Sequence, residues 1–391
     1  MYNVAILGFG VVGAGTAEVL SSNRDIIKSR CGEDISITHI LDIRDFPGSP
    51  FESVITKNAD DVFEDPDLDL CIETIGGARI AYEFTKRALS KGISVVTSNK
   101  ELVSTKGPEL LKIAEENSCS YLFEAAVGGG IPIIRPLYRC LAANKVIRIC
   151  GIVNGTTNYI LSSMKDKGIS YDEALKQAQA NGYAEADPTA DVEGIDAQRK
   201  LSILSTIAMN GIYVSPDEIE TEGISSVSLD DIKYADSIGC QIKLIAYFER
   251  IGDRCAAFVK PHFVNRDRMI GNVDDVFNAV MVEGDFVGET LFYGRGAGSL
   301  PTASAVAGDV IELAACKKSE FVQPWSVPAS SVVVPFDEVK SSYIFWSIGD
   351  NSAFNGIDTV KLGDAVIING ITSGHAIELA SKASSSVMNY L

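Results

Sequence analysis

Apolar residues in the first third of the chain come in short runs separated by segments of helical periodicity. The runs have the length of buried strands, and they lie at 2–7, 35–41, 68–74, 93–98 and 120–127. Helical patterns follow three of them, at 14–23, 81–91 and 107–116. This alternation predicts a Rossmann-type doubly wound parallel sheet, an α/β fold whose sites lie beyond the carboxyl ends of its strands.

The middle of the chain changes to longer segments that alternate apolar and polar residues. We expect strands there at 145–153, 241–250, 254–264, 273–286 and 289–294. Helical patterns lie among them, at 157–165, 170–180, 196–210 and 225–240. These segments predict a second, α+β domain with antiparallel strands.

We therefore expect two domains and a tail. A dinucleotide-binding domain covers 1–135 and is completed by a helix within about 295–320, which should pack back on it. A substrate-binding and dimerisation domain covers 136–294. At 322–391 the composition shifts towards proline and serine, which indicates a short C-terminal unit.

Composition narrows the class of protein. The 391 residues carry a net charge of −18, which argues against nucleic acid as a partner, because binding it needs an excess of lysine and arginine. No apolar run is long enough to span a membrane, and no signal peptide precedes the first strand. The eight cysteines are scattered without a CxxC pair, which is typical of reduced core residues in a cytoplasmic protein.

The first strand is followed at once by GFGVVG, a glycine-rich turn that opens a helix. In this strand–turn–helix context the GxGxxG spacing predicts a dinucleotide site. The glycines let the backbone approach the pyrophosphate, and the helix N-terminus stabilises its charge. The cofactor-binding residues expected here are Gly8, Phe9, Gly10, Val11, Val12 and Gly13.

The second strand ends at Asp42, with Arg44 two residues later. Asp42 would accept the ribose hydroxyls of NAD, whereas Arg44 could pair with the 2′-phosphate of NADP, so the sequence supports both cofactors. Gly76, Ser98 and Lys100 lie at the ends of the next two strands, and we expect them around the nicotinamide. Lys100 could also be an ordinary solvated lysine.

The helix expected at 196–210 places two charges on its apolar face. Lys200 lies in the middle of the apolar stripe, and Asp196 lies one turn earlier on the same stripe. Because burying an unpaired ion is costly, the two form either a structural ion pair or an active-site lysine with an acidic partner. Glu185 lies in an acidic loop before the helix. That loop favours the second interpretation, since it would make a negative pocket suited to an ammonium group.

Other polar positions leave alternatives open. Glu124 lies in an expected apolar strand before a glycine-rich bend, so it either pairs with an arginine or lysine or joins backbone carbonyls around a hard cation. The polar turn that holds Asn154 and Thr156 either lines a substrate pocket or caps the next helix. Gly296, in another glycine-rich turn, would allow a ligand close to the backbone.

Six segments, in this order, resemble homoserine dehydrogenases: GFGVVG, TSNKE, EAAVGGGIPII, GIVNGTTNYIL, NGYAEADPTADVEGIDAQRK and GRGAGSLPTAS. The match covers residues 2 to about 315. It implies an NAD(P)-dependent oxidoreductase that interconverts L-homoserine and L-aspartate 4-semialdehyde by hydride transfer, in threonine, methionine and isoleucine biosynthesis. The implied partner is a second copy of the chain, in a homodimer or homotetramer formed through the second domain's sheet.

The resemblance also implies roles for single residues. Lys200 would be the general acid/base on the homoserine hydroxyl, and Lys100 a second catalytic lysine. A lysine qualifies when burial or a second cation lowers its pKa towards neutrality. Substrate ligands would be Glu185 and Asp196, with Thr156 a further candidate. Gly182 and Gly296 match positions next to the cofactor. A sodium ion would be held at Glu124, Val127, Gly129 and Ile131.

Many members of this family carry a C-terminal regulatory ACT domain. Strand patterns at 341–348 and 364–370, and a helix expected over 375–391, resemble its first and last portions. Only a short segment separates the two strands. We therefore expect a truncated unit without room for a complete βαββαβ arrangement, and no full ACT site for threonine.

Overall fold

The computed structural model describes residues 1–316 and 323–391 of the chain. The described residues form two compact units, each made of three separate segments. The segments of unit 1 are Met1–Asn144, Ser202–Ser215 and Gly294–Pro328, and those of unit 2 are Lys145–Leu201, Pro216–Tyr293 and Ala329–Leu391. The domain limits expected near residues 320 and 322 fall outside the described residues. None of the described helices is long and apolar enough to cross a membrane.

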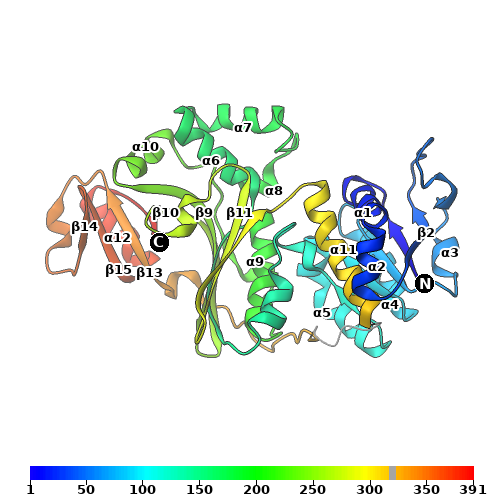
Figure 1. The fold of residues 1–391 in the computed structure, drawn as a ribbon. Coiled ribbons are helices and arrows are strands. Elements are labelled where there is room, and N and C mark those ends of the chain that lie inside the picture. Colours follow the sequence, from blue (N-terminus) through cyan, green and yellow to red (C-terminus); the bar gives the residue numbers. More distant parts are fainter. Residues whose placement is uncertain (317–322) are drawn as a thin grey trace. The chain divides into compact units, whose positions relative to one another are not determined.

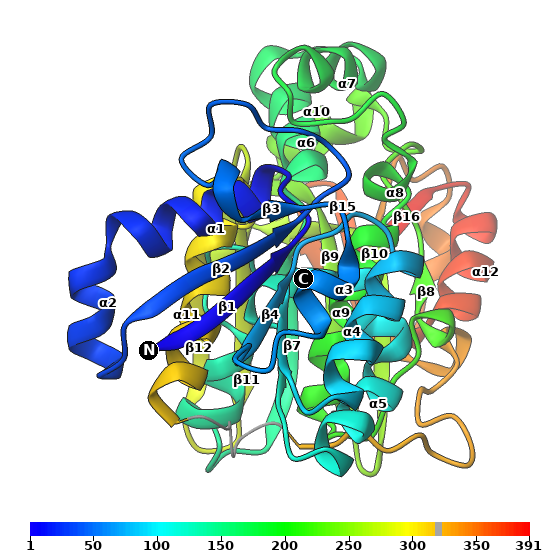
Figure 2. The same ribbon diagram turned by 90° about the vertical axis from the view of Figure 1, so that its right-hand side faces the viewer.

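Unit 1 contains a six-stranded parallel sheet in the order β3-β2-β1-β4-β5-β6, which confirms the doubly wound α/β fold. Figure 2 shows α1, α2 and α11 on one side of these strands and α3, α4 and α5 on the other. The strands are β1 (Tyr2–Leu7), β2 (Ile35–Leu41), β3 (Ile55–Thr56), β4 (Leu70–Glu73), β5 (Ser94–Thr97) and β6 (Tyr121–Leu122). The helices are α1 (Val11–Ser22), α2 (Arg24–Cys31), α3 (Ala59–Phe63), α4 (Arg79–Ser90), α5 (Lys100–Glu116) and α11 (Ser299–Cys316).

The core of unit 1 lies between β1 and two helices, α1 and α11. Val4 and Ile6 of β1 are fully buried, as is Val306 of α11. Gly15 lets α1 approach α11 closely, because a Cβ at this position would lie 2.6 Å from the hydroxyl oxygen of Ser299. This packing holds the end of β1 in place, and with it the glycine-rich turn that follows.

The helix expected at 107–116 begins earlier than the sequence suggested. It starts at Lys100, because the side-chain oxygen of Asn99 accepts the N–H of Leu102 at 3.1 Å and caps the helix there. Gly107 and Pro108, where the expected helix began, lie inside α5 without interrupting it. Lys100 therefore lies in the first turn of a helix and not in the expected loop.

Unit 2 contains a ten-stranded sheet in the order β12-β11-β7-β9-β10-β16-β13-β15-β14, with β8 beside β10. The pairs β11–β7, β7–β9 and β9–β10 are antiparallel, which confirms the α+β architecture expected for the middle of the chain. The strands of this part are β7 (Val146–Ile152), β8 (Glu220–Thr221), β9 (Cys240–Ile251), β10 (Arg254–Asn265), β11 (Phe277–Gly284) and β12 (Gly288–Arg295). The helices are α6 (Gly155–Lys167), α7 (Tyr171–Ala180), α8 (Thr189–Val192), α9 (Ile195–Ala208) and α10 (Leu229–Ser237).

The C-terminal part of unit 2 has more strands than expected. They are β13 (Lys340–Trp346), β14 (Val360–Leu362), β15 (Ala365–Thr372) and β16 (Ser386–Tyr390), with α12 (Ser373–Ala383) beside β13 and β15 (Figure 1). The prediction of one helix over 375–391 was wrong, because Ser384 adopts a left-handed conformation (φ +48°) and ends it. All four strands of a βαββαβ arrangement are therefore present. Its first helix is reduced to a 3₁₀ turn at Asn351–Phe354.

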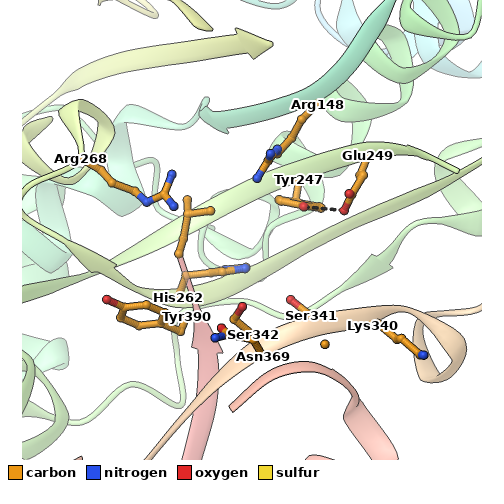
Figure 3. A pocket seen from close by; sticks show the side chains of 12 residues that line it. Arg148, Tyr247, Glu249, His262, Arg268, Lys340, Ser341, Ser342, Asn369 and Tyr390 are labelled. Atoms are coloured by element: carbon orange, nitrogen blue, oxygen red, sulfur yellow. Dashed lines mark hydrogen bonds between the residues drawn. The ribbon is translucent and has the colours of Figure 1, made fainter. Parts of the chain in front are cut away.

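A cavity of about 270 Å³ lies in unit 2, lined by residues of β7, β9 and β10 and of β13, β15 and β16. Arg148 and Arg268 extend towards each other inside it, and Tyr247 donates its hydroxyl to Glu249 at 2.7 Å (Figure 3). Arg148 is also paired with Glu283 at 2.7 Å. None of the site residues expected from the sequence lines this cavity.

Candidate functional site

The turn between β1 and α1 has a backbone that only glycine accommodates. Gly8 has φ +92°, and a Cβ on Gly13 would lie 2.1 Å from the carbonyl oxygen of Gly8. Gly10 is the N-cap residue of α1 and provides no side-chain hydrogen bond to its first turn, where Val11 is exposed. An oxyanion can therefore take the place of a side-chain cap at this helix N-terminus.

Asp42 and Arg44 form a two-point ion pair beside this turn. Arg44 Nε and Nη2 donate to the two carboxylate oxygens at 3.0 and 2.8 Å, and the N–H of Phe9 donates to the same group at 2.7 Å. The Arg44 guanidinium holds the pKa of the Asp42 carboxyl far below its usual range. Arg44 is mostly exposed and is the nearest heavy-atom neighbour of a Cβ built on Gly10, at 4.0 Å. A cofactor phosphate at this turn would meet a guanidinium before it met the buried carboxylate.

We expect Arg44→Ala to weaken NADP binding by about 10- to 100-fold, the effect of one lost charge-assisted hydrogen bond or two. NAD binding should stay unchanged or improve, because Asp42 is then released to accept ribose hydroxyls. Fluorescence titration of both reduced cofactors checks this. An equal loss of affinity for the two cofactors would show that Arg44 does not contact the 2′-phosphate.

Glu73, at the end of β4, is a buried carboxyl group that the sequence analysis did not single out. It accepts the hydroxyl of Thr97 at 2.5 Å and the N–H of Ile75 at 2.7 Å. Asn99, next to Lys100, donates to carbonyl oxygens in the loop that contains Gly76. This network ties the ends of β4 and β5 together, so it fixes the backbone around Gly76, Ser98 and Lys100. The signal was available, since Glu73 stands in an apolar run just as Glu124 does.

Burial raises the pKa of Glu73 from 4.5 to about 7. The Glu73 carboxyl loses its proton near pH 4.5 in the unfolded chain and near pH 7 in the folded chain. The extra proton affinity of the folded state therefore stabilises it fully below about pH 4.5, and this stabilisation is lost as the pH rises through about 7. The shift corresponds to about 3 kcal/mol of unfolding free energy. We expect Glu73→Gln to remove this pH-dependent part of the stability. Between pH 5 and pH 8 the unfolding free energy, measured with denaturant, should then decrease less in the variant than in the wild type. Equal decreases in the two proteins would contradict the assignment.

Lys100 occupies the first position of α5 and is partly buried, with Ser98 and Asn99 before it. A positive charge at a helix N-terminus opposes the helix dipole. The helix dipole therefore does not explain a lysine at this position.

Lys200 and Asp196 are both buried on α9, as the helical pattern predicts, with 7% and 4% of their surface exposed. Lys200 Nζ donates to Asp196 Oδ2 and to the backbone carbonyl of Val153, each at 2.7 Å. Val153 directly follows β7, so the ammonium group is held at the end of a central strand of unit 2. The pair is desolvated and fixed at both ends, which suits a group that exchanges a proton in a defined direction.

The polar turn after β7 caps a helix, one of the two alternatives left open. Asn154 Oδ1 accepts the N–H of Thr157 at 2.9 Å and caps α6. Thr156 donates its hydroxyl to the carbonyl oxygen of Tyr183 at 2.7 Å. Thr156 thereby ties the start of α6 to the acidic loop.

The acidic loop begins where α7 ends. Gly182 makes the turn with φ +74°, and Gln179 donates to the backbone carbonyl of Glu185 at 3.1 Å. Glu185 is exposed, so its carboxylate is accessible to a ligand from solvent. The loop then continues through α8 to the helix that holds Lys200.

Glu124 makes contacts that neither of the two expectations named. The strand expected at 120–127 stops at Leu122, and Glu124 lies in a 3₁₀ turn. Its carboxylate accepts the backbone N–H groups of Ile133, Ile134 and Arg135 at 2.6, 2.9 and 2.6 Å. Both expectations were incomplete, because neither considered amides from beyond the glycine-rich bend.

A buried charge network surrounds this carboxylate. The N–H of Glu124 donates to Asp309 at 2.9 Å, and Asp309 is paired with Arg135. Burial raises the pKa of Asp309 to about 8 against the opposing effect of the Arg135 guanidinium. The network joins the bend to α11 inside unit 1.

The glycine-rich bend gathers backbone oxygens. A Cβ on Gly128 would lie 2.3 Å from the carbonyl oxygen of Ile131, and one on Gly129 would lie 2.3 Å from that of Gly296. Val127, Gly129 and Ile131 are all buried. Among the described residues no group of three or more His, Cys, Asp or Glu side chains could hold a metal ion. A cation at this bend would rely on carbonyl oxygens and one carboxylate, which suits a hard ion.

Comparisons with known proteins agree with this arrangement. The family model described as "Homoserine dehydrogenase, NAD binding domain" matches residues 8–124, and that described as "Homoserine dehydrogenase" matches residues 132–311. Homoserine dehydrogenase of Neisseria gonorrhoeae is 38% identical, over 100% of this chain and 93% of that protein. The enzyme of Pseudomonas aeruginosa is 44% identical, over 81% of this chain and 73% of that protein.

Solved structures give the same result. The crystal structure of a homoserine dehydrogenase from Thiobacillus denitrificans has a TM-score of 0.88 at 35% identity, covering 100% of this chain and 98% of that one. A hyperthermophilic archaeal homoserine dehydrogenase in complex with NADPH has a TM-score of 0.69 at 29% identity, covering 82% and 99%. By sequence over its whole length and by fold, the chain belongs to the homoserine dehydrogenase family.

Proposed function

We propose that Lys200 transfers the proton in the interconversion of L-homoserine and L-aspartate 4-semialdehyde by this NAD(P)-dependent oxidoreductase. The observation that carries the proposal is the buried ion pair of Lys200 with Asp196, fixed to the end of β7. An alcohol loses its hydroxyl proton as the hydride leaves, so a positioned base is needed at that oxygen. In the reverse direction the same group, as an ammonium, protonates the oxygen of the aldehyde.

Other residues bind and orient the substrate in this proposal. Glu185 and Asp196 bind the homoserine ammonium group, which their negative charge favours, and Thr156 contributes from the start of α6. Lys100 is the second catalytic lysine. Its place at the start of α5 supports this role, because the helix dipole there opposes a permanent positive charge.

The cofactor binds at the β1–α1 turn, and when bound it supplies or accepts the hydride. The α1 N-terminus and the backbone of Gly8–Gly13 receive the pyrophosphate. Gly76 and Ser98, at the carboxyl ends of β4 and β5, and Gly182 and Gly296, by resemblance, complete the contacts. We propose NADP as the preferred cofactor, since Arg44 already engages Asp42 and remains exposed at the turn.

Sodium is the proposed ion at the glycine-rich bend. The donor set fits, because a carboxylate has about four acceptor positions and Glu124 uses three of them for backbone N–H groups. Carbonyl oxygens at Val127, Gly129 and Ile131 would provide the remaining ligands, and oxygen-only ligation suits an alkali ion. The bound ion would hold the bend rigid beside Gly296.

We also propose the domain roles and the assembly that the resemblance implies. Residues 1–135 with about 295–320 bind the cofactor, 136–294 bind substrate and self-associate, and 322–391 form the C-terminal unit. The eight free cysteines, most of them buried, support a cytoplasmic location.

The test is an activity assay on the purified chain with L-homoserine and NAD⁺ or NADP⁺, followed by the absorbance of the reduced cofactor. We expect turnover with at least one cofactor and a higher kcat/KM with NADP⁺. Folded protein that turns over homoserine with neither cofactor would refute the proposal.

A further inference from the structure

Asn154 links the cap of α6 to two carboxylates. Its Nδ2 donates to Asp191 Oδ1 at 2.7 Å and to Asp196 Oδ2 at 2.9 Å. Its Oδ1 accepts the N–H of Thr157, which can only donate, so the amide group must point towards the carboxylates. The side chain is 6% exposed and uses its oxygen and both N–H groups in this way.

The amide therefore acts on the atom that holds Lys200. Asp196 Oδ2 accepts from Asn154 and from Lys200 Nζ, at 2.9 and 2.7 Å. A carboxylate oxygen shared between two donors is confined more narrowly than one held by a flexible lysine alone. Because Asn154 is fixed by the backbone of α6, it transmits the position of that helix to the ion pair.

The same contact reduces a repulsion. Asp191 and Asp196 both accept a hydrogen bond from Asn154 Nδ2, so their two carboxylates lie side by side in a largely buried place. The amide N–H groups, with their positive ends towards the oxygens, offset part of this charge. Without them Asp196 would exert a stronger negative field on Lys200 and favour its protonated form.

We propose that Asn154 is a positioning residue for the Lys200–Asp196 pair, in addition to capping α6. It acts through Asp196: it sets the place of that carboxylate and the pH range in which Lys200 accepts a proton. This inference rests on the proposed function of Lys200.

Two substitutions separate the two roles of Asn154. Serine at a helix N-cap preserves the capping acceptor but lacks the amide donors, whereas alanine lacks both. We expect Asn154→Ser and Asn154→Ala to lower kcat/KM for homoserine alike, by about 10- to 100-fold, because each removes the donor that confines Asp196 Oδ2 beside Lys200. Only Asn154→Ala should also lose the stability of the cap. Ser228→Ala, which removes the cap of α10, is the matched control and should lower the melting temperature without changing turnover.

The readout specific to positioning is the pH profile of homoserine oxidation. In both Asn154 variants the rise of kcat/KM should move to higher pH, since the neutral amine is then reached later. The KM for the cofactor should not change. Calorimetric titration of homoserine into the cofactor complex gives a second readout, with weaker binding expected in both variants.

The outcomes distinguish the inference from the function on which it rests. An inactive wild type, or a fully active Lys200→Ala, would refute the proposed function itself. An active wild type with an unshifted pH profile in Asn154→Ser would overturn the positioning role alone. A loss of activity in Asn154→Ala but not in Asn154→Ser would also overturn the positioning role, because the lost helix cap would then account for the whole loss of activity.

Discussion

Lys200→Ala is expected to lower kcat/KM for homoserine by about 10³-fold or more, the usual contribution of a positioned acid or base. Asp196 and the carbonyl oxygen of Val153 hold the Lys200 ammonium group at the end of β7. Alanine has no group that could replace it in proton transfer. Cofactor affinity should be nearly unchanged. Steady-state kinetics and a cofactor titration on the same preparation measure both quantities.

The variant also leaves the Asp196 carboxylate without its buried cation, which by itself destabilises a protein. Lys243 provides the matched control. It is a second buried lysine of unit 2, 1% exposed and paired with Asp274 at 2.8 Å. Lys243→Ala should lower the melting temperature as Lys200→Ala does, yet keep turnover. Equal loss of activity in the two variants would mean that destabilisation, not proton transfer, explains the result.

Glu124→Ala is expected to have the largest effect on stability, about 3–5 kcal/mol, as for other broken buried charge networks. It removes the acceptor of three buried backbone N–H groups, among them that of Arg135, while the backbone N–H at position 124 still donates to Asp309. Denaturant unfolding measures the change. Glu124→Gln retains one side-chain oxygen, so it should lose less. A loss below about 1 kcal/mol in Glu124→Ala, the value of a single net hydrogen bond, would contradict the network described here.

A comparison of salts separates the structural role of Glu124 from the proposed ion. If sodium binds at the bend, the wild type should be more stable in sodium chloride than in choline chloride at equal ionic strength, because a ligand that binds only the folded state stabilises it. Glu124→Ala should lose that difference. Equal stability of the wild type in the two salts would argue against the ion but leave the hydrogen-bond network intact.

Helical periodicity was sufficient to predict the inward direction of Lys200 and Asp196, because four residues along a helix return to the same face. The partners of Glu124 could not be predicted in this way. They lie nine to eleven positions later, across a glycine-rich bend whose path follows from packing and not from any repeat. Asn154 was recognised as a cap candidate, but its donors reach residues of α8 and α9 that only the fold brings to it.

The strands likewise divide into those that the local sequence pattern predicts and one that depends on long-range pairing. The parallel sheet of unit 1 follows from the alternation of apolar runs and helical segments, and the doubly wound α/β fold was confirmed. The last strand, β16, was missed because Ser386–Tyr390 follows a helix with no glycine or proline between them. Its pairing with β10 and β13 is a long-range contact, which local propensity does not contain.

Chemical rescue of Lys200→Ala tests the central claim most directly. Small primary amines such as ethylamine fit the space that the lysine side chain vacates and provide the missing base. The account predicts a low rate of homoserine oxidation without amine and a rate that rises with the concentration of neutral amine, while Lys243→Ala does not respond. Near-wild-type turnover of Lys200→Ala in the absence of amine, or no increase at any amine concentration, would contradict it.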